Sequence, residues 1–131
     1  MTPVEKSDTK TICLVDDDPA VLKSLERLLA SYGFSVRSFS NPKSFLAYVQ
    51  AYPVPVVVLD IWMEDMIGLE VQANLSALSP STRVIIITGH NDPSAKLVAH
   101  HLGVVALFTK PFDSGQFLSA VHGALAMHPI E

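Results

Sequence analysis

The 131-residue sequence has little cysteine, no excess of basic residues and no long hydrophobic run. Its one cysteine, Cys13, excludes an internal disulfide and suits a reducing compartment. Nine basic against 13 acidic residues give a net charge of −4, which argues against a domain that holds nucleic acid by charge. No apolar stretch approaches the roughly 20 residues that cross a bilayer, and residues 1–10 lack the apolar centre of a signal peptide. These absences predict a cytoplasmic domain that binds neither nucleic acid nor a membrane.

Apolar residues, by contrast, make up 49% of the chain. A chain of this length is one domain by the usual size of domains, and it can bury about 65–70% of its unfolded surface. Polar residues stand at both ends of the sequence. We expect a single folded domain over residues 11–127, with a polar tail at 1–10 and a short tail at 128–131.

The apolar residues follow two alternating periodicities. Five short runs rich in β-branched residues predict strands at Ile12–Val15, Phe34–Phe39, Val54–Leu59, Val84–Thr88 and Val104–Phe108. Several runs, such as Val56–Leu59, are apolar at every position, which is typical of strands covered by helices on both faces. Between the runs, apolar residues recur at helical spacing, as at Leu22, Leu25 and Leu29.

Helix-start signals separate the strands from the segments that follow them. Asp18, Asn41 and Asp92 each precede a proline, and Asp113 stands three residues before Gln116, so each side chain is placed to cap a helix. Strict alternation of strands and helices predicts an α/β fold with right-handed crossovers, a five-stranded parallel sheet and helices on both of its faces. We expect a doubly wound, flavodoxin-like (βα)5 domain with strand order 2-1-3-4-5.

Polar residues stand just after four of the expected strands. The run 16–18 is three aspartates, Asp60 ends the third strand, Thr88 ends the fourth, and Lys110 follows the fifth. In a doubly wound sheet, ligands bind outside the carboxyl ends of the strands. The sequence therefore predicts a functional site that contains these residues.

Carboxylates that meet at one edge of a sheet need a proton or a cation between them. Two unit charges about 4 Å apart repel by roughly 4 kcal/mol at an effective dielectric near 20. An all-oxygen site formed by Asp16, Asp17 and Asp60 suits Mg²⁺ better than zinc or copper. A divalent cation bound there, the hydroxyl of Thr88 and the ammonium of Lys110 would together clamp a transferring phosphoryl group. A carboxylate such as that of Asp60 can itself be the nucleophile.

The sequence resembles the receiver domain of bacterial two-component response regulators, the chemotaxis-regulator-like superfamily, over about residues 10–127. The resemblance rests on four motifs in the family's order and spacing: the aspartates 16–18, Asp60 with Met63 and Gly68, Thr88-Gly89, and Lys110-Pro111. Two segments are similar to the FixJ-type branch of the family: Thr88-Gly89-His90 and Lys110-Pro111-Phe112.

The resemblance implies a role for each matching residue. Asp60 resembles the phosphoacceptor, and Lys110 and Thr88 resemble the residues that contact the phosphoryl oxygens. Asp17 resembles a direct ligand of Mg²⁺, for which Mn²⁺ can substitute, and Asp16 resembles a ligand acting through water. The resemblance also implies a metal ligand in the backbone carbonyl of Trp62 and a cis peptide bond between Lys110 and Pro111.

The family's activity implies partners. A sensor histidine kinase or a histidine phosphotransfer protein would donate the phosphoryl group, and the added charge would bias the surface of the fourth helix, fifth strand and fifth helix. A phosphorylation-dependent homodimer through that surface is a further expectation. Such a domain phosphorylates and dephosphorylates itself slowly, so it is a switch more than a turnover enzyme.

Three features depart from the family's pattern or vary within it. Glu64 stands where the family usually has proline, and Leu107 stands where it usually has an aromatic that reports the active state. Alternation along the strand would aim Phe108 to the opposite side, so Phe108 is a poor substitute. Trp62 and His90 occupy the variable positions that tune the lifetime of the phosphoryl group.

Two other functions compete with phosphorylation-controlled signalling. One is a phosphorylation-independent receiver that acts as a constitutive protein-interaction module, for which Glu64 and Leu107 are the supporting features. The other is a metal-dependent phosphohydrolase with an aspartyl nucleophile, which would need a substrate cap that 131 residues do not accommodate. Asp18 is expected to be a helix cap only, and His100-His101 a solvated patch, because adjacent residues do not share a helix face.

Overall fold

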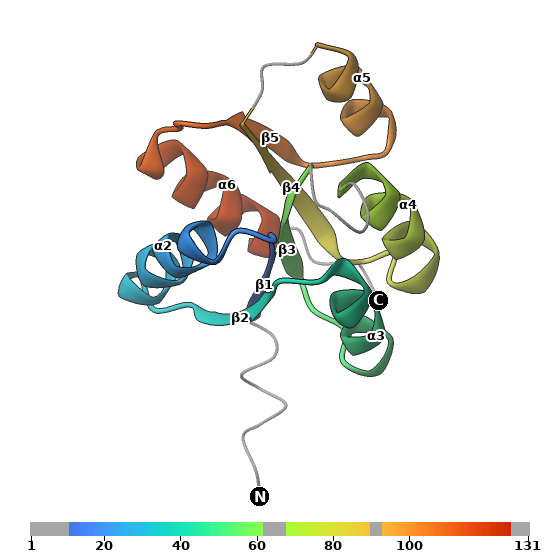
Figure 1. Cartoon of the computed structure of the whole chain (residues 1–131), viewed down its shortest axis with the longest axis horizontal. Coiled ribbons are helices and arrows are strands. Elements are labelled where there is room, and N and C mark those ends of the chain that lie inside the picture. Colours follow the sequence, from blue (N-terminus) through green and yellow to red (C-terminus); the bar gives the residue numbers. More distant parts are fainter. Residues whose placement is uncertain (1–10, 62–67, 90–92, 127–131) are drawn as a thin grey trace, which may run out of the picture.

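The computed structural model describes residues 11–61, 68–89 and 93–126, in which strands and helices alternate along the chain (Figure 1). The strands are β1 (Thr11–Val15), β2 (Ser35–Phe39), β3 (Val56–Asp60), β4 (Arg83–Thr88) and β5 (Ala106–Thr109). The helices are α2 (Pro19–Ser31), α3 (Pro42–Ala51), α4 (Gly68–Leu78), α5 (Pro93–His101) and α6 (Ser114–Ala126).

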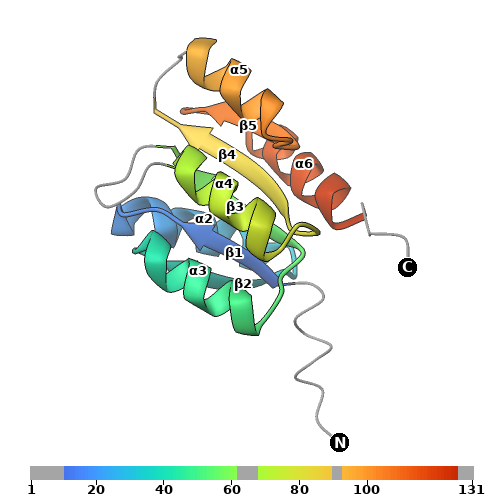
Figure 2. The same cartoon turned by 90° about the vertical axis from the view of Figure 1, so that its right-hand side faces the viewer.

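The strands form one parallel sheet in the order β2-β1-β3-β4-β5. Helices α2 and α6 lie on one face of the sheet, and α3, α4 and α5 lie on the other (Figures 1 and 2). The expected α/β class, the flavodoxin-like topology and the strand order are therefore confirmed. Because β1, β3 and β4 are the inner strands, the residues at their carboxyl ends are neighbours.

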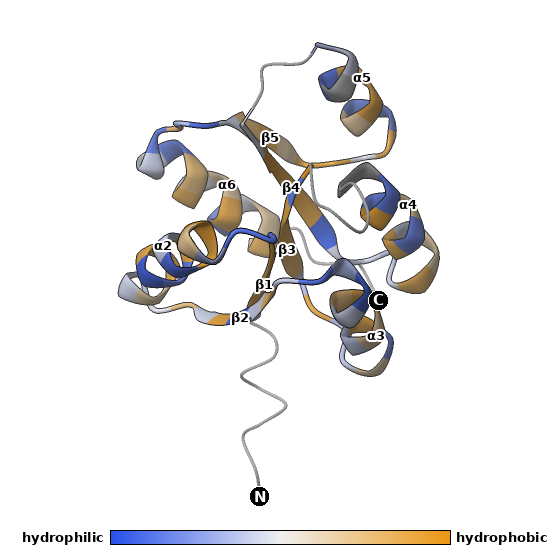
Figure 3. Ribbon diagram, viewed as in Figure 1, coloured by the Kyte–Doolittle hydropathy of each residue, from blue (hydrophilic) through white to orange (hydrophobic). Residues whose placement is uncertain are grey.

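The sheet divides the core into two apolar clusters. Inner strands β1 and β3 are buried at every position, as their continuous apolar sequences predict, and apolar residues dominate the middle of the ribbon in Figure 3. Alternate residues of β3 serve the two clusters: Val57 and Leu59 pack with Phe45 of α3, whereas Val56 and Val58 pack with Phe117 of α6. This alternation fixes which way the residues at the strand ends point.

Side-chain caps begin three of the helices where the sequence predicts them. The carboxylate of Asp18, the amide oxygen of Asn41 and the carboxylate of Asp113 accept hydrogen bonds from first-turn N–H groups at 2.9, 2.7 and 2.8 Å. Asp92, the cap predicted for α5, lies outside the described residues. No described helix combines the length and apolar character needed to span a bilayer.

Three strands begin later than the sequence predicts. Strand β2 begins at Ser35 rather than Phe34, because the Phe34 N–H donates to the carbonyl of Leu29 in α2 at 3.2 Å. Strand β3 begins at Val56 rather than Val54, since the proline between them has no N–H to give to the ladder. Strand β5 begins at Ala106 rather than Val104, because the Val104 N–H donates to the carbonyl of Ala99 at 3.2 Å. That bond belongs to the end of α5, so Val104 completes a helix cap before the strand starts.

Candidate functional site

Strand register brings the predicted acidic residues to one edge of the sheet. In the β1–β3 ladder Val15 pairs with Leu59, so Asp16 and Asp60, the next residue of each strand path, stand at the same level. Three carboxylates gather there: one oxygen each from Asp16, Asp17 and Asp60 lies within 4.8 Å of the others. Asp16 and Asp60 are only 1% and 8% exposed, whereas Asp17 is exposed. The cluster is thus a half-buried group of oxygen ligands.

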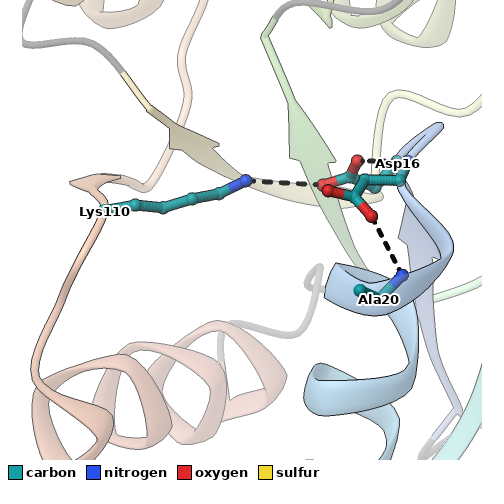
Figure 4. Close-up of polar contacts among 4 residues, drawn as sticks. Asp16, Ala20 and Lys110 are labelled. Carbon is teal, nitrogen blue, oxygen red and sulfur yellow. Dashed lines mark hydrogen bonds and ion pairs between the residues drawn. The ribbon is translucent and has the colours of Figure 1, made fainter.

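Asp16 is the most buried carboxylate of the cluster, and its two oxygens differ. Oδ1 accepts a hydrogen bond from the Asp18 N–H at 2.9 Å, while Oδ2 has no hydrogen-bond partner in the described part of the chain. The Lys110 ammonium lies 3.7 Å from Oδ2, reaching across from the end of β5 (Figure 4). Burial raises the pKa of Asp16, and the Asp18 N–H and the Lys110 charge offset only part of this rise.

Lys110 and Thr88 are tied to each other through the backbone. The Lys110 N–H donates to the Thr88 carbonyl at 2.7 Å, and the Lys110–Pro111 peptide bond is cis. Thr88 is buried at the end of β4, and Thr109 pairs with it in β5. The ends of β4 and β5 therefore hold the hydroxyl and the ammonium at the same edge as the acids.

Sequence comparison agrees with this geometry. The family model of the response regulator receiver domain matches residues 12–122. The chain belongs to this family. Its members serve two-component signalling, and the acidic group Asp16, Asp17 and Asp60 could bind a metal ion, as is typical of receiver domains.

Two curated relatives show which response regulators this receiver domain is similar to. The response regulator protein TodT of Pseudomonas putida is 39% identical over 118 residues, which are 90% of this chain and 52% of TodT. The transcriptional regulatory protein FixJ of Rhizobium meliloti is 35% identical over 114 residues, 87% of this chain and 56% of FixJ. The receiver domain thus spans about half the length of the curated relatives it matches.

A solved structure shares the fold across its whole length. The beryllofluoride-activated NtrC4 receiver domain dimer, determined in solution, has a TM-score of 0.85 and 28% sequence identity to this chain. The match covers 89% of this chain and 97% of the NtrC4 chain.

The donor set of the receiver domain fits a hard divalent cation. The cluster offers carboxylate oxygens and neither sulfur nor imidazole, which favours Mg²⁺ or a similar ion over zinc or copper. Oδ2 of Asp16 is buried without a hydrogen bond, so a cation would satisfy an atom that the described protein groups leave unsatisfied. The carboxylates of Asp17 and Asp60 would complete the negative side of such a site.

Strand alternation separates the remaining predicted residues into two sets. Leu107 packs with the cluster beneath α3 and α4, whereas Phe108 packs on the opposite face, its ring 5.9 Å from that of Phe117. Phe108 therefore cannot stand in for an aromatic at position 107, as the sequence predicts. Along β4, Ile86 belongs to the α3–α4 side, so alternation directs Thr88 to the side of Leu107.

Several predicted residues lie outside the described part of the chain. These are Trp62, with its carbonyl ligand and tuning role, His90, with its tuning role, and the loop residues Met63, Glu64 and Asp65. Asp18 is described, and its carboxylate caps α2 by accepting from the Ala20 N–H at 2.9 Å. Its expected role as a helix cap is confirmed.

Sequence reasoning did not find the ion pair between Asp16 and Lys110. The two residues are 94 positions apart (110 minus 16), and only the strand order brings them together. One signal was present: an aspartate that directly continues an entirely apolar inner strand is expected to be buried. A buried carboxylate needs a cationic partner, and Lys110 is the cation at the same edge.

Proposed function

We propose that this receiver domain accepts a phosphoryl group on Asp60, from a histidine kinase or a histidine phosphotransfer protein in the cytoplasm. One observation carries the proposal: Asp60 ends the central strand β3 inside a cluster of carboxylates whose oxygens lie within 4.8 Å, at an edge that also holds Lys110. A carboxylate so placed has beside it two further carboxylates that could bind a cation, and an ammonium at the same edge.

The chemistry is a transfer between two nucleophiles. A carboxylate oxygen of Asp60 attacks the phosphorus of a phosphohistidine, forming a P–O bond while the P–N bond breaks, and the leaving imidazole takes a proton. Charge develops on the equatorial phosphoryl oxygens as the group passes, so catalysis consists mainly of positioning and electrostatic stabilisation. Water later attacks the acyl phosphate and restores the carboxylate with release of inorganic phosphate.

The neighbouring residues divide the remaining work. Asp17 would bind the cation directly and Asp16 through water, with the backbone carbonyl of Trp62 as a further ligand. Mg²⁺, or Mn²⁺ in its place, would supply the positive charge that neutralises the oxygens of the transferring group. Lys110 leaves Asp16 and pairs with a phosphoryl oxygen, which its unbranched side chain, 30% exposed, is free to reach. The Thr88 hydroxyl donates to another phosphoryl oxygen.

A pocket beside Lys110 supports an encounter with a phosphohistidine-bearing partner. It has a volume of ≈ 250 Å³ and is lined by residues of α2 and of the sheet edge: Ala20, Val21, Ser24, Leu25, Ile87, Lys110 and Phe112. An apolar partner surface that packs there would bring its histidine to the edge that holds Asp60.

The output surface is α5, β5 and α6, with a homodimer as its phosphorylated form. Leu97 and Val98 of α5 are 62% and 44% exposed, so the surface offers apolar area to a second copy. The related NtrC4 receiver domain is a dimer in its beryllofluoride-activated state. Phosphorylation adds about −1.5 to −2 charges, which is enough to bias a loop-and-helix surface between two states.

The test is intact-mass measurement after incubation with a small phosphodonor and Mg²⁺. We expect the wild-type chain to gain one phosphoryl group and Asp60→Asn to gain none. Asp113→Asn is the matched control, because it also removes one carboxylate but keeps a residue that caps α6. Equal labelling of wild type and Asp60→Asn would overturn the proposal.

The competing functions correspond to other outcomes of the same experiment. A wild-type chain that binds Mg²⁺ but gains no phosphoryl group would be a phosphorylation-independent interaction module. Rapid multiple turnover of unrelated phosphate esters would instead identify a phosphohydrolase.

A further inference from the structure

A buried glutamine joins two helices that are distant in sequence. Gln72 of α4 is 5% exposed, and its Nε2 donates to the carbonyl of Leu102 at 2.7 Å, across 30 residues of sequence. Leu102 directly follows α5, which ends at His101. The amide orientation follows from chemistry, since the opposite orientation would set two carbonyl oxygens against each other.

Helix α5 has little other apolar attachment to the domain. Ala99 is the one buried residue among the side chains of α5 that the structure describes, and Leu97 and Val98 are exposed. By comparison, α2 buries Leu22, Leu25 and Leu29, and α6 buries four residues. Because packing holds α5 weakly, specific hydrogen bonds carry more of its position.

Those bonds gather at the carboxyl end of α5. The N–H groups of Leu102, Gly103 and Val104 donate to carbonyls of the last turn of α5 at 3.0, 3.1 and 3.2 Å. Gly103 has a φ of +80°, the left-handed conformation that closes a helix in this way. The Leu102 carbonyl points away from this cap to Gln72, so one amide connects the capped end of α5 to α4.

We propose that Gln72 is a positioning residue that anchors the carboxyl end of α5 and makes this end the pivot of the switch surface. The anchor lies at the edge of the sheet opposite the acidic cluster, whereas α5 begins at Pro93, five residues after Thr88. Movement of α5 is then smallest at His101 and largest at Pro93. The pivot rests on the proposed function, because it concerns the change on phosphorylation, whereas the anchor does not depend on that function.

The surroundings of Gln72 indicate that its N–H donor, and not its size or its amide oxygen, is what the anchor uses. Oε1 of Gln72 has no hydrogen-bond partner in the described part of the chain. The residue lines a pocket of ≈ 240 Å³ between α4 and the end of α5, which is large enough for water to reach the amide. A methionine would fill the same space without a buried amide, so packing alone does not require glutamine here.

Amide hydrogen exchange on the full chain, resolved by residue with NMR, tests the anchor in the resting state. Gln72→Met removes the donor at nearly constant size. We expect amide exchange at Leu102, Gly103 and Val104 to rise about 3- to 10-fold, which corresponds to the loss of one hydrogen bond. Exchange in β3 should be unchanged. Unchanged exchange at these three amides would overturn the anchor.

Two control variants separate an anchor from ordinary destabilisation. Ser76→Ala alters the same helix and pocket, but the Ser76 hydroxyl donates within α4, to the Gln72 carbonyl at 3.1 Å, so exchange near α5 should stay at the wild-type rate. Leu75→Ala opens a cavity at a buried position and should raise exchange throughout the core. If Gln72→Met raised amide exchange throughout the core, as Leu75→Ala does, Gln72 would only contribute to packing, and the proposal would be overturned.

Beryllofluoride with Mg²⁺, which mimics the phosphoryl group, tests the pivot. In the wild type we expect the changes in backbone NMR chemical shift along α5 to grow from His101 toward Pro93. In Gln72→Met we expect them to extend over the whole helix. Changes at His101 as large as those at Pro93 in the wild type would overturn the pivot. If beryllofluoride does not bind at all, the proposed function fails, while the resting-state exchange still decides the anchor.

Discussion

Two buried polar sites at opposite ends of the sheet differ in how well their hydrogen bonds are satisfied. At the amino end, the Ser79 and Thr82 hydroxyls lie 2.7 Å apart, and Thr82 donates to the Val54 carbonyl at 2.7 Å. At the carboxyl end, Asp16 is buried more deeply, yet its Oδ2 has no hydrogen bond, and Lys110 stays 3.7 Å away. Near the amino end, the neutral Oε1 of Gln72 also lacks a partner in the described part of the chain, but it lines a pocket that water can enter. The unpartnered Asp16 oxygen belongs to a buried charge, which costs more than an unpartnered amide, so it marks the part of the domain that is built for a ligand.

The largest expected effect separates two adjacent aspartates at the carboxyl end. Asp17→Asn removes the carboxylate that we propose as a direct ligand of the cation. We expect phosphoryl adduct formation to slow by about 100-fold or more, because mutating even the outer partners of metal ligands costs about 10- to 100-fold. Intact-mass time courses at fixed Mg²⁺ measure this rate.

Asp18→Asn is the matched control for the loss of charge. It removes the same charge one residue later but keeps a good cap for α2, so its rate should stay within about twofold of wild type. Equal slowing in both variants would mean that the charge of the loop matters and a specific ligand does not.

The second effect breaks the satisfied network at the amino end. Thr82→Val keeps the shape but leaves the Val54 carbonyl and the Ser79 hydroxyl without this partner, so we expect the free energy of unfolding to fall by about 2 kcal/mol. Ser81→Ala in the same turn, at an exposed position, should change it by less than about 0.5 kcal/mol. Urea unfolding measures both values, and phosphoryl adduct formation should be unaffected in either variant.

The sequence predicts the carboxyl end far better than the amino end. Asp60 and Lys110 are recognisable because each follows an apolar strand, and the fold class then brings strand ends together. Gln72 has no comparable signal: it stands between Val71 and Leu75 in an apolar stripe, and its partner is a backbone carbonyl. A contact made to a carbonyl leaves no trace in residue type, so it appears only once the helices are placed.

The third effect has the opposite sign to that of Thr82→Val. Asp16→Asn removes a charge that burial disfavours, and the partly exposed Lys110 ammonium loses little when that charge is removed. In the presence of a chelator we therefore expect the free energy of unfolding at pH 7 to rise. A less stable variant at pH 7 would mean that the Lys110 ion pair outweighs the cost of burial.

The pH dependence follows from the direction of the shift. Because burial raises the pKa of Asp16 above its ordinary value of 3.8, the folded chain keeps the proton at pH values where the unfolded chain has lost it. Stability from this group therefore falls as pH rises from about 3.8 to the raised pKa of Asp16, and stays low above it. The advantage of Asp16→Asn should grow over that window, as urea unfolding of both proteins at several pH values measures.

The smallest effect is the stabilisation of the folded chain by the cation itself. At Mg²⁺ ten times above its dissociation constant, we expect the wild type to gain about 1.4 kcal/mol of unfolding free energy, because the folded state alone holds the site. Thr82→Val should gain the same amount, since the two ends of the sheet are distant and their effects add. Asp16→Asn should gain less, because it no longer brings a third carboxylate to the cluster. A full Mg²⁺ increment in Asp16→Asn, measured by thermal unfolding, would show that the unsatisfied oxygen of Asp16 does not serve the cation, and the contrast between the two ends would then need another cause.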